Sequence, residues 1–235
     1  MIVLRKKTIV SSLLLLTCIC GVFFLKSVEK PSVSAFSAVN AGNTVIVVDA
    51  GHGGEDGGAV SPDGVEESQI NLAIARQVQD LLLLNGQPVV MTRTEDVSLD
   101  NGEATVRKRK SADLRNRAAL VNGVEHAALL SIHQNSLPSS PITHGAQVFW
   151  NQQVGAQELA QAVQDGLNLC INPGNEKHCK QIPSSVYLMK ESKAPAVLVE
   201  CGFLSNPQET EALQDITYQR KLALTIAAGM LYGIA

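Results

Sequence analysis

The chain has no excess of basic residues. Its 235 residues include 19 lysines and arginines against 22 aspartates and glutamates, which gives a formal net charge of -3 at pH 7. Recognition of a nucleic-acid backbone normally requires a clustered surplus of positive charge, so this balance argues against a nucleic-acid partner. One basic run, RKRK at residues 107–110, is interpreted as a solvated loop. Its alternative is contact with an anionic glycan or partner.

The chain also lacks cysteine pairs of the kind that bind zinc. After the apolar N-terminal segment the cysteines are Cys170, Cys179 and Cys201, and none of them has CxxC spacing. A thiolate zinc site is therefore not indicated. Cys170 and Cys179 could form a local disulfide after export or stay free thiols, because spacing alone does not define connectivity.

The N-terminal segment has the pattern of an export signal. Three basic residues at positions 5–7 precede an almost purely apolar stretch at residues 9–25, and a stretch rich in serine and alanine follows. This order is typical of a signal peptide or a membrane anchor, and both cleavage and retention fit it. We therefore expect an exported protein whose N-terminus contacts the membrane. Its expected parts are a signal peptide or anchor at 1–27, a linker at 28–43 and one folded domain at 44–235.

Beyond the linker, the hydrophobic pattern alternates between strands and helices. Short runs of valine, isoleucine and leucine alternate with segments whose apolar residues recur at helical spacing, for example Ile70, Ile74 and Val78. Such alternation is typical of an α/β domain in which helices cover a buried sheet. The predicted strands are 45–48, 89–92, 128–132, 146–150 and 196–199. The predicted helices are 68–84, 113–121, 157–169, one that starts at 206–207, and 217–231, with irregular chain at 94–110 and 170–185.

Three side chains that could bind a metal or transfer a proton come at the ends of predicted strands. His52 follows the first strand, His133 ends the third, and Glu200 ends the last. The carboxyl ends of the strands in an open α/β sheet converge on one binding crevice. A single histidine at such a place is more often structural, but two histidines with a carboxylate match the ligands of a catalytic zinc site. The pattern therefore favours a metal-dependent enzyme.

The glycine-rich segment GHGGEDGG at residues 51–58 has phosphate binding as its rival interpretation, because such loops place glycines between a strand and a helix. The segment contains neither Gly-Lys-Ser/Thr nor a clean Gly-x-Gly-x-x-Gly. Acidic residues that would repel a phosphate lie in it and after it, namely Glu55, Asp56, Asp63, Glu66 and Glu67. We expect the glycines to let the backbone turn tightly around a metal.

Four segments resemble the zinc-dependent N-acetylmuramoyl-L-alanine amidase family in order and spacing. They are DAGHGG at 49–54, ESQINLA at 67–73, SIHQN at 131–135 and VECGFLSN at 199–206. The resemblance covers about residues 44–235 and makes this part a zinc amidase catalytic domain. It implies an α/β fold around a mostly parallel central sheet with helices on both faces.

The resemblance also implies the cofactor, the reaction and the residues involved. His52, Glu67 and His133 are expected to hold a single Zn²⁺ ion, with Glu200 as the general acid/base. The implied reaction is hydrolysis of the amide bond between N-acetylmuramic acid and L-alanine in peptidoglycan. A different class stays open, namely a membrane-tethered binding module or scaffold that keeps the fold and the zinc without turnover. Such a module has no need of Glu200.

Within the family, the chain looks most similar to the germination-specific cortex amidases of endospore-forming bacteria. The residues behind this narrower resemblance are MTR at 91–93, RKSADLRNR at 109–117 and YLM at 187–189. It implies removal of stem peptides from spore cortex in the developing spore, a step towards the muramic lactam needed for germination. Some relatives rely on an activating lipoprotein, so such a partner is also expected.

Glu66 and Glu67 are neighbours, and only one of them is expected to bind the metal. Successive residues at a helix entrance point in different directions, so both carboxylates can hardly reach one ion. The positive end of the helix dipole favours both equally. The family pattern places the ligand four residues before Asn71, which selects Glu67.

Four further residues have two interpretations each. Asn135 is either a substrate contact or a turn residue. Arg93 and Arg117 either bind substrate carboxylates or pair structurally, and the structural role is favoured. Cys201 stands where the family usually has an aliphatic or small residue, and we expect it to be a small buried hydrophobe rather than a thiol that perturbs Glu200.

Overall fold

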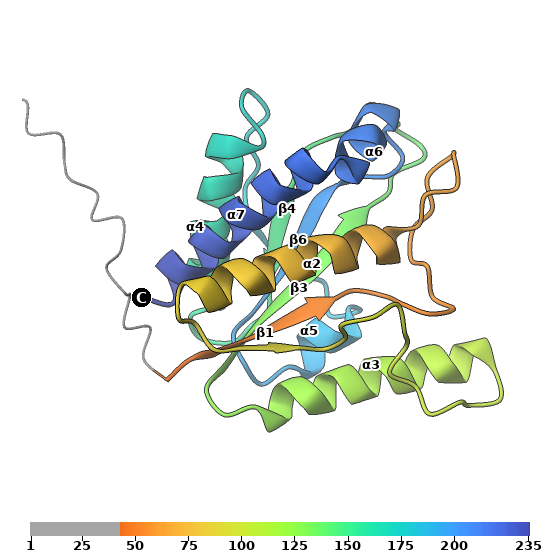
Figure 1. Cartoon of the computed structure of the whole chain (residues 1–235), viewed down its shortest axis with the longest axis vertical. Helices are drawn as coiled ribbons and strands as arrows, with labels where there is room; N and C mark the ends of the chain where they lie inside the picture. Colours follow the sequence, from red (N-terminus) through yellow and green to blue (C-terminus); the bar gives the residue numbers. More distant parts are fainter. Residues whose placement is uncertain (1–42) are drawn as a thin grey trace, which may run out of the picture. The chain divides into compact units, whose positions relative to one another are not determined.

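The computed structural model describes residues 43–235 (Figure 1). The predicted export segment at 1–27 lies outside the described residues, and so does the linker up to residue 42. Within residues 43–235, none of the helices combines the length and the apolar character needed to cross a membrane.

One six-stranded sheet forms the centre of the domain, in the strand order β2-β1-β3-β6-β4-β5. Neighbouring strands β2, β1, β3 and β6 run parallel, and only the β4–β6 pair is antiparallel. The predicted α/β fold with a mostly parallel sheet is therefore confirmed. The strands are β1 (Val45–Ala50), β2 (Val89–Met91), β3 (Ala127–Asn135), β4 (Gln147–Trp150), β5 (Lys180–Gln181) and β6 (Ala196–Phe203).

Helices cover both faces of this sheet, as expected (Figure 1). One face packs against α2 (Glu67–Leu84), α4 (Ala156–Cys170) and α7 (Ile216–Gly233). The other face packs against α3 (Val106–Gly123) and α5 (Tyr187–Glu191). The short helix α6 (Pro207–Gln214) follows β6 and packs on α7.

The apolar spacing of α2 explains both its helical form and its position. Ile70, Ile74, Val78 and Leu82 recur every four residues and are at most 4% exposed. This spacing places them on one side of a helix, where they pack against the sheet. The helix ends at Leu84, as predicted, and Asn85 is its C-cap. Each of these fully buried aliphatic side chains contributes about 1.5–3 kcal/mol through loss of contact with water.

Helix α3 begins earlier than predicted. It starts at Val106, so the predicted loop at 94–110 is wrong over its last five residues. The side chain of Thr105 caps the helix by accepting a hydrogen bond from the backbone N–H of Lys108. Lysine and arginine are good helix formers. The hydrophobic pattern missed them because none of the side chains at residues 106–111 of α3 is buried.

Strands β3 and β6 extend beyond the residues at which they were predicted to end. His133 and Glu200 lie inside these strands and are direct partners across them, so the prediction that both are terminal is wrong. Pairing resumes between Asn135 and Phe203 after a register shift. The run of apolar residues in each strand ends before His133 and Glu200. Backbone hydrogen bonding between the strands nevertheless continues through these polar residues. Elements as short as β5 and α5 gave no periodic signal.

The three cysteines of the described part are free thiols. Of the two alternatives for Cys170 and Cys179, a disulfide or free thiols, the structure shows free thiols. Cys201 is fully buried in the apolar core between the sheet and α2, α4 and α7. Burial raises the pKa of its thiol well above the usual range, which keeps it protonated and unreactive. Its interpretation as a small buried hydrophobe is confirmed.

Candidate metal centre

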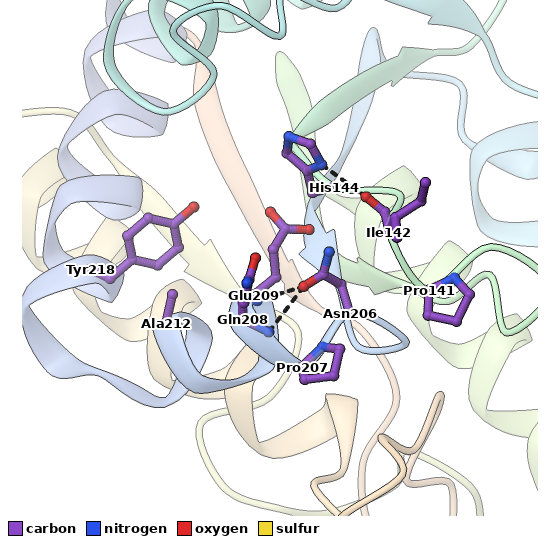
Figure 2. Close-up of a pocket in the computed structure, with 9 residues that line it drawn as sticks. All are labelled: Pro141, Ile142, His144, Asn206, Pro207, Gln208, Glu209, Ala212 and Tyr218. Atoms are coloured by element: carbon purple, nitrogen blue, oxygen red, sulfur yellow. Dashed lines mark hydrogen bonds between the residues drawn. The ribbon is translucent and has the colours of Figure 1, made fainter.

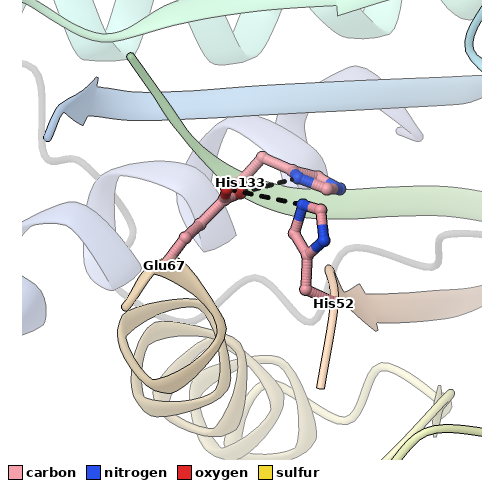
Figure 3. A group of neighbouring side chains, drawn as sticks. All are labelled: His52, Glu67 and His133. Carbon is pink, nitrogen blue, oxygen red and sulfur yellow. Dashed lines mark hydrogen bonds and ion pairs between the residues drawn. The ribbon is translucent and has the colours of Figure 1, made fainter. Parts of the chain in front are cut away.

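Three side chains meet at the carboxyl edge of the central strands. His52 lies two residues beyond β1, His133 lies near the end of β3, and Glu67 is the first residue of α2. Each offers one ligand atom, and these atoms lie within 4.8 Å of one another (Figure 3). His52 Nε2 is 3.4 Å from Glu67 Oε2, and His133 Nδ1 is 2.8 Å from Glu67 Oε1. In the described part of the chain, this is the one group of three such residues.

The dimensions and chemistry of this cluster fit a zinc ion. Zinc bonds to histidine nitrogen and carboxylate oxygen measure about 2.0–2.2 Å, so tetrahedral ligand atoms lie about 3.4 Å apart. The backbone leaves room for these side chains only because two neighbours are glycines. A methyl group on Gly51 would overlap the ring of His133, and one on Gly58 would overlap both His52 and Glu67. The glycine-rich segment is therefore shaped around the three candidate ligands.

Glu67 is fixed in the cluster by hydrogen bonds from three groups besides the histidines. Its Oε1 accepts from the backbone N–H of Gln134 (3.0 Å) and the side chain of Asn71 (3.1 Å), while its Oε2 accepts from the N–H of Ala59 (2.8 Å). Burial works against the charge of this carboxylate, but the hydrogen bond and charge of His133 outweigh burial and lower the pKa of Glu67 to about 2. The cluster contains Glu67 and not Glu66.

Glu200 lies beside the cluster with an unsatisfied oxygen. It is the cross-strand partner of His133, and adjacent strands are about 4.8 Å apart. Its Oε2 is buried and has no hydrogen-bond partner among the described residues. Burial raises the pKa of Glu200 to about 7; the positive charge of His133 opposes this rise, and the negative charge of Glu67 adds to it. A buried carboxyl oxygen without a partner is costly, and it is commonly retained for a function.

Arg117 joins α3 to the strand that leads to His52. Its guanidinium, 2% exposed, donates to Asp49 Oδ1 (2.7 Å) and Asp113 Oδ2 (2.8 Å) and to the backbone carbonyls of Ala50 and His52. Asp49 is itself fully buried, yet the charge of Arg117 and further hydrogen bonds hold its pKa below the usual value. His52 has a φ of 63°, an unusual conformation that the bond to its carbonyl helps to maintain.

Arg93 supports the end of β1 and the start of the glycine-rich segment that follows it. It donates to the carbonyls of Ala50 (2.8 Å), Gly51 (3.1 Å) and Ser68 (2.8 Å). All five donors of an arginine lie in one plane, which suits it to fixing several carbonyls at once. The favoured structural role of Arg93 and Arg117 is therefore confirmed.

The other candidate, Asn135, lies two residues beyond His133 as the last residue of β3. Its side chain accepts a hydrogen bond from the N–H of Ser136 (2.8 Å), and its carbonyl accepts one from the N–H of Leu204 (2.8 Å). It is therefore a paired strand residue rather than a turn residue. Its half-buried side chain stays at the same edge of the sheet as the cluster.

Sequence reasoning missed the residues that support the candidate ligands. Asp56 Oδ2 lies 2.9 Å from His52 Nδ1 and 2.9 Å from Lys110 Nζ. Burial opposes the charge of Asp56, but hydrogen bonds from His52 and Lys110 hold its pKa below the usual range. Asn71, four residues after Glu67, bonds both Glu67 and Gln134. Helical spacing could have revealed Asn71, whereas Lys110 was assigned to a loop.

A separate cavity of about 500 Å³ lies next to α6 and contains none of the cluster residues (Figure 2). Glu209 points into it between His144 and Tyr218. The carboxylate accepts hydrogen bonds from the backbone N–H groups of Gly145 (2.9 Å) and Phe203 (2.7 Å). It thus ties the start of α6 to the segment before β4.

The sequence model of the N-acetylmuramoyl-L-alanine amidase family matches residues 46–232, which is most of the chain. The chain belongs to this family. The amidase is 36% identical over 188 residues to a germination-specific N-acetylmuramoyl-L-alanine amidase of Bacillus subtilis. The aligned residues make up 80% of this chain and 78% of that protein. The resemblance inferred from the four sequence segments is thereby confirmed.

The amidase also resembles two further bacterial proteins, one compared by sequence and one by structure. It is 32% identical over 192 residues to a probable cell wall amidase, LytH, of Staphylococcus aureus. The aligned residues make up 79% of this chain but only 56% of that longer protein. Its structure matches the CwlD amidase of Clostridioides difficile, which was solved in complex with the GerS lipoprotein. That match has a TM-score of 0.78 and 35% identity, and it covers 81% of this chain and 98% of the other.

Proposed function

We propose that this amidase hydrolyses the bond between N-acetylmuramic acid and L-alanine in peptidoglycan with the help of one zinc ion. The observation that carries the proposal is the cluster of His52, Glu67 and His133 beside the unpaired buried carboxyl of Glu200. Two histidines and one carboxylate form a ligand set typical of hydrolytic zinc sites, which keep a fourth position for water or substrate. Glu200 supplies a group that can exchange protons near neutral pH.

The reaction requires a proton to move from water to the departing amine. When bound, zinc acts as a Lewis acid and lowers the pKa of water from about 15.7 to about 7. Glu200 accepts a proton from the attacking water, because a base with a pKa near 7 is half deprotonated at neutral pH. It then gives this proton to the L-alanine nitrogen as the C–N bond breaks. The products are a carboxylate on the muramic acid and a free peptide amine.

The substrate must be held while this transfer takes place. We assign Asn135 to substrate binding, because it follows His133 at the same edge of the sheet. Its Oδ1 already accepts the N–H of Ser136, which leaves the side-chain amide N–H groups to donate to a substrate carbonyl. Such a donor suits both the peptide and the N-acetyl groups of peptidoglycan.

The relatives support a proposal for the wider role. The B. subtilis relative is germination-specific, so we assign this amidase to removal of stem peptides from spore cortex, a step towards muramic lactam. This role requires export, for which residues 1–27 are the proposed signal peptide or membrane anchor. The C. difficile relative forms a complex with a lipoprotein, and we assign a comparable activating partner to this chain.

Removal of the metal tests this function. Treatment of the purified protein with a chelator is expected to abolish the release of peptides from purified peptidoglycan, and added zinc is expected to restore it. The Lewis-acid chemistry that zinc would supply to the site is lost with the metal. Peptide release is followed by chromatography, and zinc content by metal analysis. Full activity in protein shown to be free of zinc would refute the proposal.

A further inference from the structure

Asp56 links the metal ligand His52 to helix α3. Its Oδ2 lies 2.9 Å from His52 Nδ1 and 2.9 Å from Lys110 Nζ. A carboxylate at Nδ1 selects the tautomer in which that nitrogen carries the proton. Nε2, which faces Glu67 at 3.4 Å, is then left with the free lone pair that a metal requires. The contact therefore determines both the orientation of the ring and its ability to bind a metal.

The segment that carries His52 needs such support because its backbone has little rigidity of its own. Gly53, Gly54 and Gly58 all have positive φ, and His52 itself has a φ of 63°. Glycines lose the most conformational freedom on ordering, so a glycine-rich segment is costly to fix in one geometry. The only strand-like pairing inside it is the isolated bridge between Gly53 and Asp56.

Helix α3 supplies the support through two adjacent basic residues. Lys110 bonds Asp56, and Arg109 Nε donates to Glu55 Oε2 at 3.0 Å. Arg109 also donates to the carbonyl of Glu103, in the segment just before the helix, at 2.7 Å. The helix is in turn anchored to β1 by the buried pair of Arg117 and Asp49. A rigid element thus holds both acidic residues of the glycine-rich segment.

We propose that Lys110 and Asp56 are positioning residues that hold His52 in the tautomer and orientation needed to bind zinc. Lys110 acts through Asp56, and Asp56 acts through His52. This relay serves the zinc site proposed above and rests on that proposal. It also gives a role to the basic run, which the sequence pattern assigned to solvent.

Zinc affinity of the full-length protein tests the relay, measured by competition with a chromophoric chelator. Loss of a carboxylate partner of a metal-binding histidine typically weakens binding about 10- to 100-fold, which is expected for Asp56→Asn. Lys110→Gln removes a half-exposed ion pair and is expected to weaken binding about three- to fivefold. Lys110→Arg keeps the charge and is expected to restore nearly all of the affinity.

The same basic run provides the matched control. Arg107 and Lys108 are exposed and form no ion pair within residues 43–235. Arg107→Gln and Lys108→Gln each remove one positive charge, as Lys110→Gln does, and are expected to leave the affinity unchanged. Equal effects of all three substitutions would show a general charge effect and overturn the relay. A full effect of Lys110→Gln in the Asp56→Asn background would overturn it as well.

A second readout separates the relay from the proposed zinc function. In the zinc-free protein, ¹⁵N NMR of the His52 ring is expected to show the tautomer protonated at Nδ1, with a shift towards a tautomer mixture in Asp56→Asn. If the wild-type protein binds no zinc, the proposed function fails while the NMR result still decides the relay. If zinc binding and the tautomer are unchanged in Asp56→Asn, the relay fails and the zinc site stands.

Discussion

Replacement of Glu200 by glutamine is expected to reduce turnover about 100- to 10,000-fold, the usual contribution of a general acid/base. Glutamine has nearly the same shape as glutamate but can neither accept the proton of water nor deliver it to the leaving amine. The zinc content is expected to stay near one per chain, because Glu200 lies outside the group of His52, Glu67 and His133. Turnover is measured as peptide release per zinc-loaded protein.

The matched control is Glu211→Gln, an exposed residue of α6. It removes the same charge away from the cluster and is expected to keep full activity. A Glu200→Gln variant with a near wild-type rate would remove Glu200 from the mechanism. Loss of zinc from that variant would instead make Glu200 a ligand.

Replacement of Glu67 by alanine is expected to abolish tight zinc binding, and with it activity. The substitution removes one of the three proposed ligands, and it also leaves His133 without its carboxylate partner at 2.8 Å. Glu66→Ala is expected to keep zinc content near one per chain with a modest change in activity, because Glu66 lies outside the cluster. Metal analysis of both purified variants makes the comparison.

This pair of variants controls for charge and for position in the chain, since the two residues are neighbours at the start of α2. Circular dichroism shows whether each variant is folded. The opposite ranking, with zinc lost in Glu66→Ala and kept in Glu67→Ala, would exclude the ligand set described here. Equal zinc content in both variants would exclude it too.

The sequence predicted those parts of the fold that depend on apolar patterning. Ile70, Ile74, Val78 and Leu82 are buried as their spacing requires, and the buried strands β1, β3 and β6 all occur. It did not predict the start of α3, because none of the side chains at residues 106–111 is buried. A pattern of buried apolar residues cannot show helical turns that bury no side chain.

The candidate site was predictable only in part for a related reason. His52, His133 and Glu200 stood out because each interrupts or follows an apolar run, and family spacing then identified Glu67. Their supporting residues gave no such signal. Asp56 and Lys110 are 54 residues apart and meet only because α3 packs beside the glycine-rich segment. Contacts of this range depend on the tertiary fold and not on local pattern.

The central claim is that the amidase breaks the bond between muramic acid and L-alanine by hydrolysis, and digestion of peptidoglycan in ¹⁸O-labelled water tests it most directly. Mass spectrometry of the products is expected to find one ¹⁸O atom in the carboxyl group of muramic acid and an unlabelled peptide that begins with a free L-alanine amine. These products should form with zinc and be absent after its removal. Label in a peptide carboxyl group, or cleavage between sugars, would contradict the account.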